Sequence, residues 1–115
     1  MKRATLRPLA EQDLVDAVQF YVKAGDHALG ERFFDAALAA LKPIERMPAM
    51  GSPRLGKLCE IPRLRTSRIT GFPAQWFYFE AEDHLDVVRL LGERQDVVAI
   101  LGANLEQPCV EQVAR

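Results

Sequence analysis

The chain has 115 residues and a formal net charge of −1, with 49% apolar and 27% charged residues. This composition is typical of one globular domain, and the near-zero charge argues against a wholly basic nucleic-acid coat. No segment approaches the roughly 20 apolar residues that span a bilayer, and the first residues lack the apolar region of a signal peptide, so we expect a cytoplasmic protein. Cys59 and Cys109 have neither disulfide nor metal spacing, and we assign no metal and no cofactor.

The charge is unevenly distributed along the chain. Residues 46–70 hold six basic side chains against Glu60 alone, whereas residues 71–115 hold 3 basic and 8 acidic side chains. Asymmetry of this kind predicts a positive patch for an acidic partner. The alternative is a solvated loop that happens to be rich in arginine.

The first half of the chain has the pattern of a strand followed by two helices. A short extended segment at residues 3–6 precedes Pro8, a residue suited to the first turn of a helix. Apolar residues at helical spacing then continue to Gly25, which is placed to end that helix. Asp26 can cap a second helix, whose apolar stripe covers residues 29–44. Two amphipathic helices joined by a short turn predict an antiparallel helical hairpin.

The second half of the chain changes from a helical to an extended pattern. Residues 51–62 contain two glycines and two prolines and are predicted to form a loop. Three strand-length segments rich in aromatic or branched residues follow, at residues 63–70, 74–80 and 85–91. Residues 96–101 can add a short helix, and residues 102–115 form a C-terminal tail. We therefore predict one α+β domain over residues 1–101, of order β-α-α-β-β-β, with the hairpin packed on one face of a small antiparallel sheet.

Three stretches of the second half carry a further pattern. Residues 48–54 are PAMGSPR, residues 76–79 are WFYF and residues 87–96 are VVRLLGERQD. In order and spacing these resemble the Pro-x-x-Gly-x-x-Arg loop, the aromatic third strand and the closing segment of the RelE/ParE toxins of bacterial type II toxin–antitoxin systems, with the ParE branch the better match. The resemblance covers about residues 3–101. Gly92 stands where the family commonly has His, so a role of that imidazole cannot operate here.

The resemblance to ParE implies a toxin that binds DNA gyrase and blocks replication without catalysing a reaction. Such an inhibitor needs exposed anchors, and interfaces favour arginine and aromatic side chains. The candidates for target binding are Arg63, Arg65, Arg68, Trp76, Arg89 and Arg94. The alternative for the arginines is surface ion pairing, and the alternative for Trp76 is core packing.

Two other readings of the resemblance differ in chemistry. The RelE branch implies a ribosome-dependent mRNA endonuclease, which needs a basic cluster together with groups that move protons. Tyr21 lies at an apolar helical position, Tyr78 lies in the third strand, and no later tyrosine replaces them, which disfavours the nuclease. A toxin-fold protein that acts only as a non-toxic binding partner is the third reading.

The resemblance also implies a cognate ParD-like antitoxin that neutralises the toxin in a heteromeric complex and associates it indirectly with DNA. An amphipathic partner helix needs an apolar groove with a charged border. Phe34 and Leu38 widen the apolar stripe of the second helix beyond the face that the sheet requires. They are therefore candidate antitoxin contacts, and burial inside the monomer is the alternative.

Overall fold

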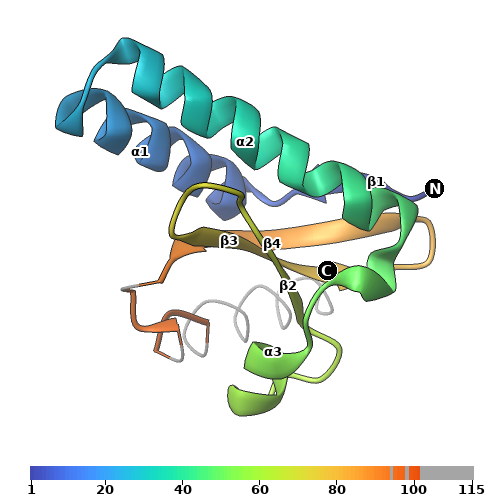
Figure 1. Cartoon of the computed structure of the whole chain (residues 1–115). Helices are drawn as coiled ribbons and strands as arrows, with labels where there is room; N and C mark the ends of the chain where they lie inside the picture. Colours follow the sequence, from blue (N-terminus) through green and yellow to red (C-terminus); the bar gives the residue numbers. More distant parts are fainter. Residues whose placement is uncertain (94, 98, 102–115) are drawn as a thin grey trace.

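The computed structural model describes residues 1–93, 95–97 and 99–101. Its elements in chain order are β1 (Arg3–Leu6), α1 (Pro8–Ala24), α2 (His27–Arg46), the 3-10 turn η1 (Pro48–Met50), α3 (Arg54–Leu58), β2 (Arg65–Arg68), β3 (Ala74–Glu80) and β4 (His84–Gly92). The α+β class, the order of the main elements and the helical hairpin are confirmed (Figure 1). Part of the predicted loop is helical, since α3 lies within it. None of the helices in the described ranges is long and apolar enough to cross a membrane.

The helical hairpin begins and turns at the residues that the pattern indicated. Pro8 stands in the first turn of α1, and the Asp26 carboxylate accepts a hydrogen bond from the Leu29 amide at 2.8 Å, which caps α2. The helices pack closely at Gly30, where an added Cβ would overlap the Val22 side chain. A larger residue at this position would therefore push α1 and α2 apart.

The sheet has the strand order β1-β4-β3-β2. The three later strands form the predicted antiparallel meander, whereas β1 pairs in parallel with β4, so the sheet is mixed. The path of the hairpin explains the parallel pair. Because α2 returns the chain to the start of β1, where the Lys2 amide donates to the Glu45 carbonyl at 2.9 Å, β2 starts at that same end. Two antiparallel turns later, β4 runs in the direction of β1.

The larger hydrophobic core lies between the hairpin and one face of the sheet. Phe33 from α2 stacks on Tyr21 from α1, with ring centroids 4.9 Å apart, and both rings meet Phe72 edge to face. Trp76 is fully buried here, and its Nε1 donates to the Ala37 carbonyl at 2.8 Å. Aromatic packing of this kind ties both helices to β3.

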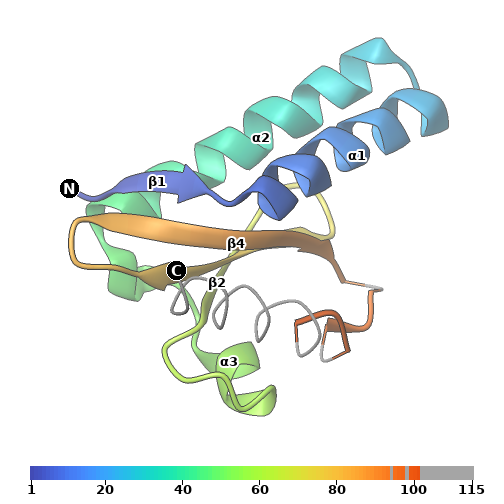
Figure 2. The ribbon, with the colours of Figure 1, turned by 180° about the vertical axis from the view of Figure 1, so that it is seen from behind.

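A second, smaller core covers the opposite face of the sheet, for which the sequence analysis made no prediction. Its fully buried residues are Leu64, Phe77, Val88, Leu91 and Leu101, and partly buried residues of α3 and the following loop pack against them. Figures 1 and 2 place the hairpin on one side of the sheet and α3 on the other. The short helix predicted from Asp96 is helical in its described part, where the Asp96 carboxylate accepts from the Ala99 amide at 3.1 Å. The predicted tail, residues 102–115, lies outside the described residues.

Candidate functional site

The Pro-x-x-Gly-x-x-Arg stretch is fastened to the sheet by a buried tyrosine. The Tyr78 hydroxyl donates to the Pro48 carbonyl at 2.6 Å and accepts from the Gly51 amide at 3.0 Å. Burial raises the pKa of Tyr78 above its usual 10.0. The glycine is required by this close approach, because an added Cβ at residue 51 would overlap the Tyr78 hydroxyl. Tyr78, which was predicted to lie in the third strand, therefore has a structural role: it holds the Pro48–Gly51 turn against the sheet.

Arg65, the cross-strand neighbour of Tyr78, holds the same turn. One of its guanidinium nitrogens donates to the Ala49 carbonyl at 3.1 Å and to the Gly51 carbonyl at 2.7 Å. Ser52 then pairs with Thr66 across an isolated antiparallel bridge. Arg65, predicted as a target contact, is consequently half-buried and has a demonstrable role within the fold.

Past this turn, the chain brings a basic segment over the second core. The Ser52 hydroxyl accepts from the Arg54 amide at 3.2 Å, and α3 begins at Arg54. Lys57 lies one turn further along α3 on the same helix face. Neither residue was among the predicted target contacts. The terminal arginine of the Pro-x-x-Gly-x-x-Arg motif is the sequence signal that would have indicated Arg54.

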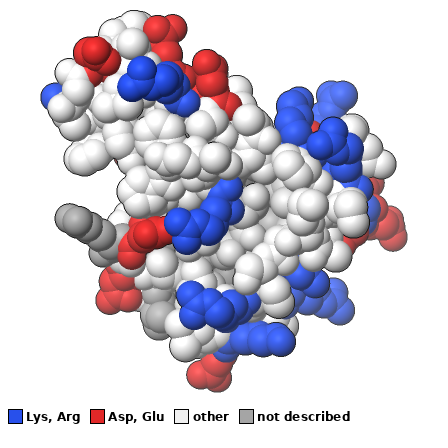
Figure 3. All heavy atoms as spheres, in the orientation of Figure 1, with Lys and Arg blue, Asp and Glu red and all other residues white. Residues whose placement is uncertain are grey.

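A groove with a volume of about 490 Å³ lies between α3 and the sheet. Its lining combines two arginines with hydroxyl, amide, carboxylate and apolar groups: Ser52, Arg54, Leu55, Thr66, Arg68, Gln75, Glu93 and Val97. Arg68 pairs with Glu93 at 2.5 Å, and both side chains are well exposed. Figure 3 shows Lys and Arg side chains over β2 and α3 on this face, with acidic atoms beside the central one. We call Arg54, Lys57, Arg63 and Arg68 the basic face.

The predicted target arginines lie in different environments. Arg63 is exposed in the turn before β2 and has no carboxylate partner within the described part of the chain. Its φ of 70° is in the left-handed region, as is the φ of 57° at Glu60. Arg68 lines the groove together with Arg54, whereas Arg63 stands in the turn before β2. Arg94 lies outside the described residues.

Arg89 forms an internal ion pair with Asp13 and does not belong to the basic face. Its Nε and Nη2 donate to the two carboxylate oxygens of Asp13 at 2.7 and 2.9 Å, and the two side chains are only 12% and 15% exposed. Asp13 also accepts from the Leu90 amide at 3.0 Å. The sequence argument considered only carboxylates in the last third of the chain, so it missed this partner on α1. Arg89 as an exposed anchor is corrected accordingly.

Trp76 is likewise not an exposed anchor in this structure. Its side chain is 0% exposed and its indole nitrogen is bonded to α2. The strand alternates so that residue 76 faces the helical hairpin, where a large ring fills the main core. The core-packing alternative thus describes Trp76 correctly.

The second candidate surface is the outer side of the hairpin. Phe34 and Leu38 are 40% and 39% exposed, and their four-residue spacing places them on one face of α2. Exposed apolar residues also stand on α1, namely Leu9, Val15 and Phe20. The alternative that Phe34 and Leu38 are buried in the monomer is therefore wrong, and both side chains are available to a partner.

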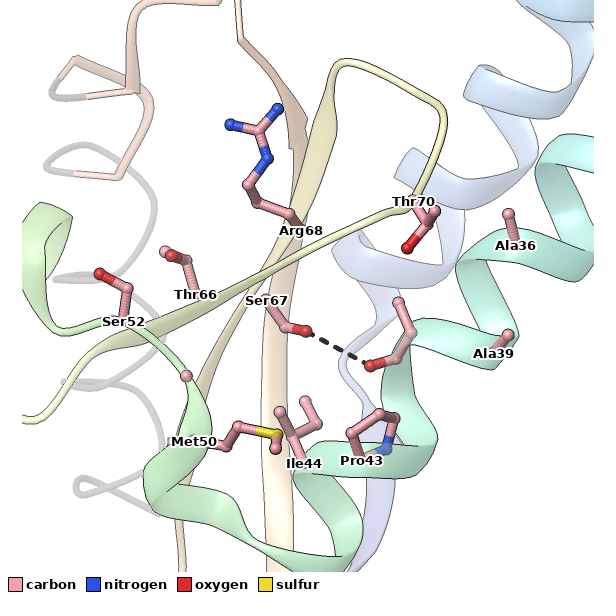
Figure 4. Close-up of a pocket in the computed structure, with 12 residues that line it drawn as sticks. Ala36, Ala39, Pro43, Ile44, Met50, Ser52, Thr66, Ser67, Arg68 and Thr70 are labelled. Carbon is pink, nitrogen blue, oxygen red and sulfur yellow. Dashed lines mark hydrogen bonds between the residues drawn. The ribbon is translucent and has the colours of Figure 1, made fainter.

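A third surface is the outer edge of β2, which Ser52 bridges at Thr66, beside a cavity of about 400 Å³ (Figure 4). Small residues of α2 such as Ala36 and Ala39 form one wall, and Ser67 reaches the Ala40 carbonyl at 3.3 Å. Arg68 points away from α2, toward the opposite face of the sheet. Phe34 and Leu38 are not among the described residues that line this cavity, so it is distinct from the apolar hairpin surface.

In the ranges that the structure describes, the Glu93 carboxylate lines the groove but is paired with Arg68, and the tyrosines and His84 do not line it. Tyr21 lies among the aromatic rings of the main core, and Tyr78 is bonded to the Pro48–Gly51 turn. His84 contacts Asp83 at 2.7 Å in the turn before β4, and the pKa of Asp83 is lowered by this hydrogen bond. Three or more His, Cys, Asp or Glu side chains placed to hold a metal ion are absent from the described ranges.

Comparison with known proteins identifies the fold and the family of the chain. A solved structure described as the chromosomal ParDE TA system from P. aeruginosa matches with a TM-score of 0.69 and 17% identity, over 80% of this chain and 96% of the other. No curated protein gives a significant match. The family model for the ParE toxin of the type II toxin–antitoxin system parDE matches residues 4–101. The chain therefore belongs to the ParE toxin family of type II toxin–antitoxin systems.

Proposed function

We propose that this ParE-family toxin inhibits DNA gyrase by binding to it and catalyses no reaction of its own. The observation that carries the proposal is the separation of its basic face from proton-transfer groups in the described residues. Both tyrosines serve the core, and the one carboxylate that lines the basic groove, Glu93, is paired with Arg68. Cations without an acid or a base bind a partner but do not cleave a phosphodiester.

The basic face supplies the contacts that such an inhibitor needs. Arg54 and Arg68 are exposed and line the groove between α3 and the sheet, and Arg63 is exposed in the turn before β2. Arginine presents a planar fork of donors, which makes it a frequent anchor in protein interfaces. We propose these three residues as the principal target contacts, while Arg65 holds the turn from which Arg54 is presented. Arg94 stays a candidate.

We further propose that a ParD-like antitoxin neutralises the toxin in the cytoplasm by covering the hairpin. Phe34 and Leu38 form an exposed apolar pair one helical turn apart, which suits the apolar face of a partner helix. Beyond the Ser52–Thr66 bridge, β2 is an edge strand, and the rest of its outer edge suits pairing with an extended segment that follows such a helix. The resulting hetero-oligomer would associate with DNA through the antitoxin.

The test combines two assays on one preparation of the full-length chain, released from its antitoxin. Supercoiling by purified gyrase should be lost, and cleaved DNA should accumulate on the enzyme, while mRNA on ribosomes stays intact. Arg63→Glu should weaken gyrase inhibition at least tenfold, and Lys23→Glu, an exposed change on α1, should not. Cut mRNA with unaffected gyrase would overturn the proposal.

The endonuclease alternative keeps one specific support, which is the groove that holds Arg54, Arg68 and Glu93 together. If the chain cleaved mRNA, Glu93 would be the candidate base within the described residues, and Glu93→Gln would abolish cutting. Under the inhibitor proposal the same substitution only releases Arg68 from its ion pair. Gyrase inhibition by Glu93→Gln should then equal or exceed that of the unchanged chain.

A further inference from the structure

The basic face carries a larger unbalanced charge than its surroundings. Segment 46–68 contains six basic residues and one acidic residue. Within the described ranges, Arg54, Lys57 and Arg63 have no carboxylate partner, and only Arg68 is neutralised by an ion pair. Since exposed cations without an ion-pair partner attract negative charge, this surface suits an anionic partner.

The neutral groups of the groove indicate the kind of anion. Ser52, Thr66 and Gln75 line it together with the arginines, and hydroxyl and amide groups are the neutral side chains that most often accompany Arg and Lys on phosphate oxygens. The spread of the cations over α3, the following turn and β2 suits a row of phosphates better than a single anion. The chemistry therefore favours a nucleic-acid backbone.

The absence of aromatic residues distinguishes between kinds of nucleic acid. Segment 46–68 contains no Phe, Tyr or Trp. Single strands are held largely by stacking of bases on aromatic side chains, whereas a duplex is held by its phosphates alone. The basic face offers the second mode and lacks the means for the first.

We propose that the basic face of this toxin binds the phosphate backbone of duplex DNA directly, through Arg54, Lys57 and Arg63, without reading base sequence. The choice of DNA over another duplex rests on the proposed function, because gyrase holds DNA when it is inhibited. Arg54 and Arg63, proposed above as target contacts, would then meet the DNA that gyrase holds, which places the toxin on the enzyme–DNA complex in preference to free gyrase. This contact is separate from any DNA association that an antitoxin provides.

The test measures fluorescence anisotropy of a labelled 20-base-pair duplex with the full-length chain, without gyrase or antitoxin, over a range of salt concentrations. Three phosphate contacts predict a slope of about −3 for log affinity against log salt. Arg54→Glu with Lys57→Glu should weaken binding at least tenfold and reduce the slope by about 2. The matched control, Lys23→Glu with Arg32→Glu, makes the same charge change on the exposed hairpin and should alter affinity less than twofold.

Three outcomes would overturn the proposal. They are no duplex binding at low salt, equal weakening by both double variants, and tighter binding of a single-stranded RNA or an acidic peptide of the same length. The slope for the unchanged chain needs no variant, so it stays informative if a variant misfolds. Because gyrase is absent from this assay, its failure is distinct from a failure of gyrase inhibition.

Discussion

Replacing Tyr78 with Phe tests the two hydrogen bonds that hold the Pro48–Gly51 turn against β3. The ring is fully buried, and its hydroxyl bonds the Pro48 carbonyl at 2.6 Å and the Gly51 amide at 3.0 Å. Each net hydrogen bond contributes about 1 kcal/mol, and leaving buried partners unsatisfied adds to the loss, so we expect a destabilisation of about 2–4 kcal/mol. For a domain of this size this lowers Tm by roughly 8–16 °C.

Urea unfolding followed by circular dichroism measures the change, with Tyr21→Phe as the matched control. The hydroxyl of Tyr21 has no hydrogen-bond partner among the described residues, so its loss should alter stability by less than about 0.5 kcal/mol. If Tyr78→Phe were no more destabilising than Tyr21→Phe, the hydrogen bonds of the Tyr78 hydroxyl would not stabilise the turn.

Gly51→Ala tests the close approach of residue 51 to the Tyr78 hydroxyl. The added Cβ would overlap the Tyr78 hydroxyl and lie 2.7 Å from the ring carbon that bears it. The substitution should therefore be less destabilising in the Tyr78→Phe background than alone, since the hydroxyl is gone. Strict additivity of the two changes would contradict the contact.

Three further predictions concern other parts of the molecule. Asp13→Ala should destabilise the fold by about 3 kcal/mol in denaturant titration, because it strands the nearly buried Arg89 guanidinium; a change below about 1 kcal/mol would refute this. Leu38→Glu should reduce antitoxin affinity at least tenfold in calorimetry while Tm stays nearly constant, whereas unchanged affinity would place the antitoxin elsewhere. Burial raises the pKa of both Tyr21 and Tyr78 above 10.0, so the unfolded chain loses these protons first. The free energy of unfolding should therefore be constant up to about pH 10 and fall as the pH rises through the raised pKa values of the folded state, by up to about 1.4 kcal/mol per pH unit for each tyrosine. An alkaline titration of stability that shows no fall would contradict this prediction.

Local signals in the sequence were sufficient to predict the main elements. Pro8, Asp26 and the helical stripes define a hairpin because capping and periodicity act within a few residues. The parallel pairing of β1 with β4 was missed because it depends on where α2 delivers the chain, which no local pattern encodes. The second core was missed as well, although the nearly continuous apolar runs of β3 and β4 are typical of strands buried on both faces.

The candidate site was predicted in part, and its misses have one physical cause. Arginine patterns indicate charge, but pairing depends on distant chain segments, so Asp13 as the partner of Arg89 lay beyond sequence reasoning. Tryptophan is frequent both among interface anchors and in cores, and the sequence did not distinguish the two roles for Trp76. In the structure Trp76 is fully buried, so it is a core residue. Phe34 and Leu38 were placed correctly as surplus apolar surface, because the helical stripe is wider than the face that the sheet covers.

The most direct measurement of the central claim is a two-stage titration of purified gyrase. The full-length toxin is added until supercoiling stops and cleaved DNA accumulates, and a ParD-like antitoxin is then added in increasing amounts. The account predicts loss of supercoiling in the first stage and its recovery in the second as antitoxin reaches the toxin concentration. Supercoiling that continues at saturating toxin, or inhibition that the antitoxin does not reverse, would contradict it.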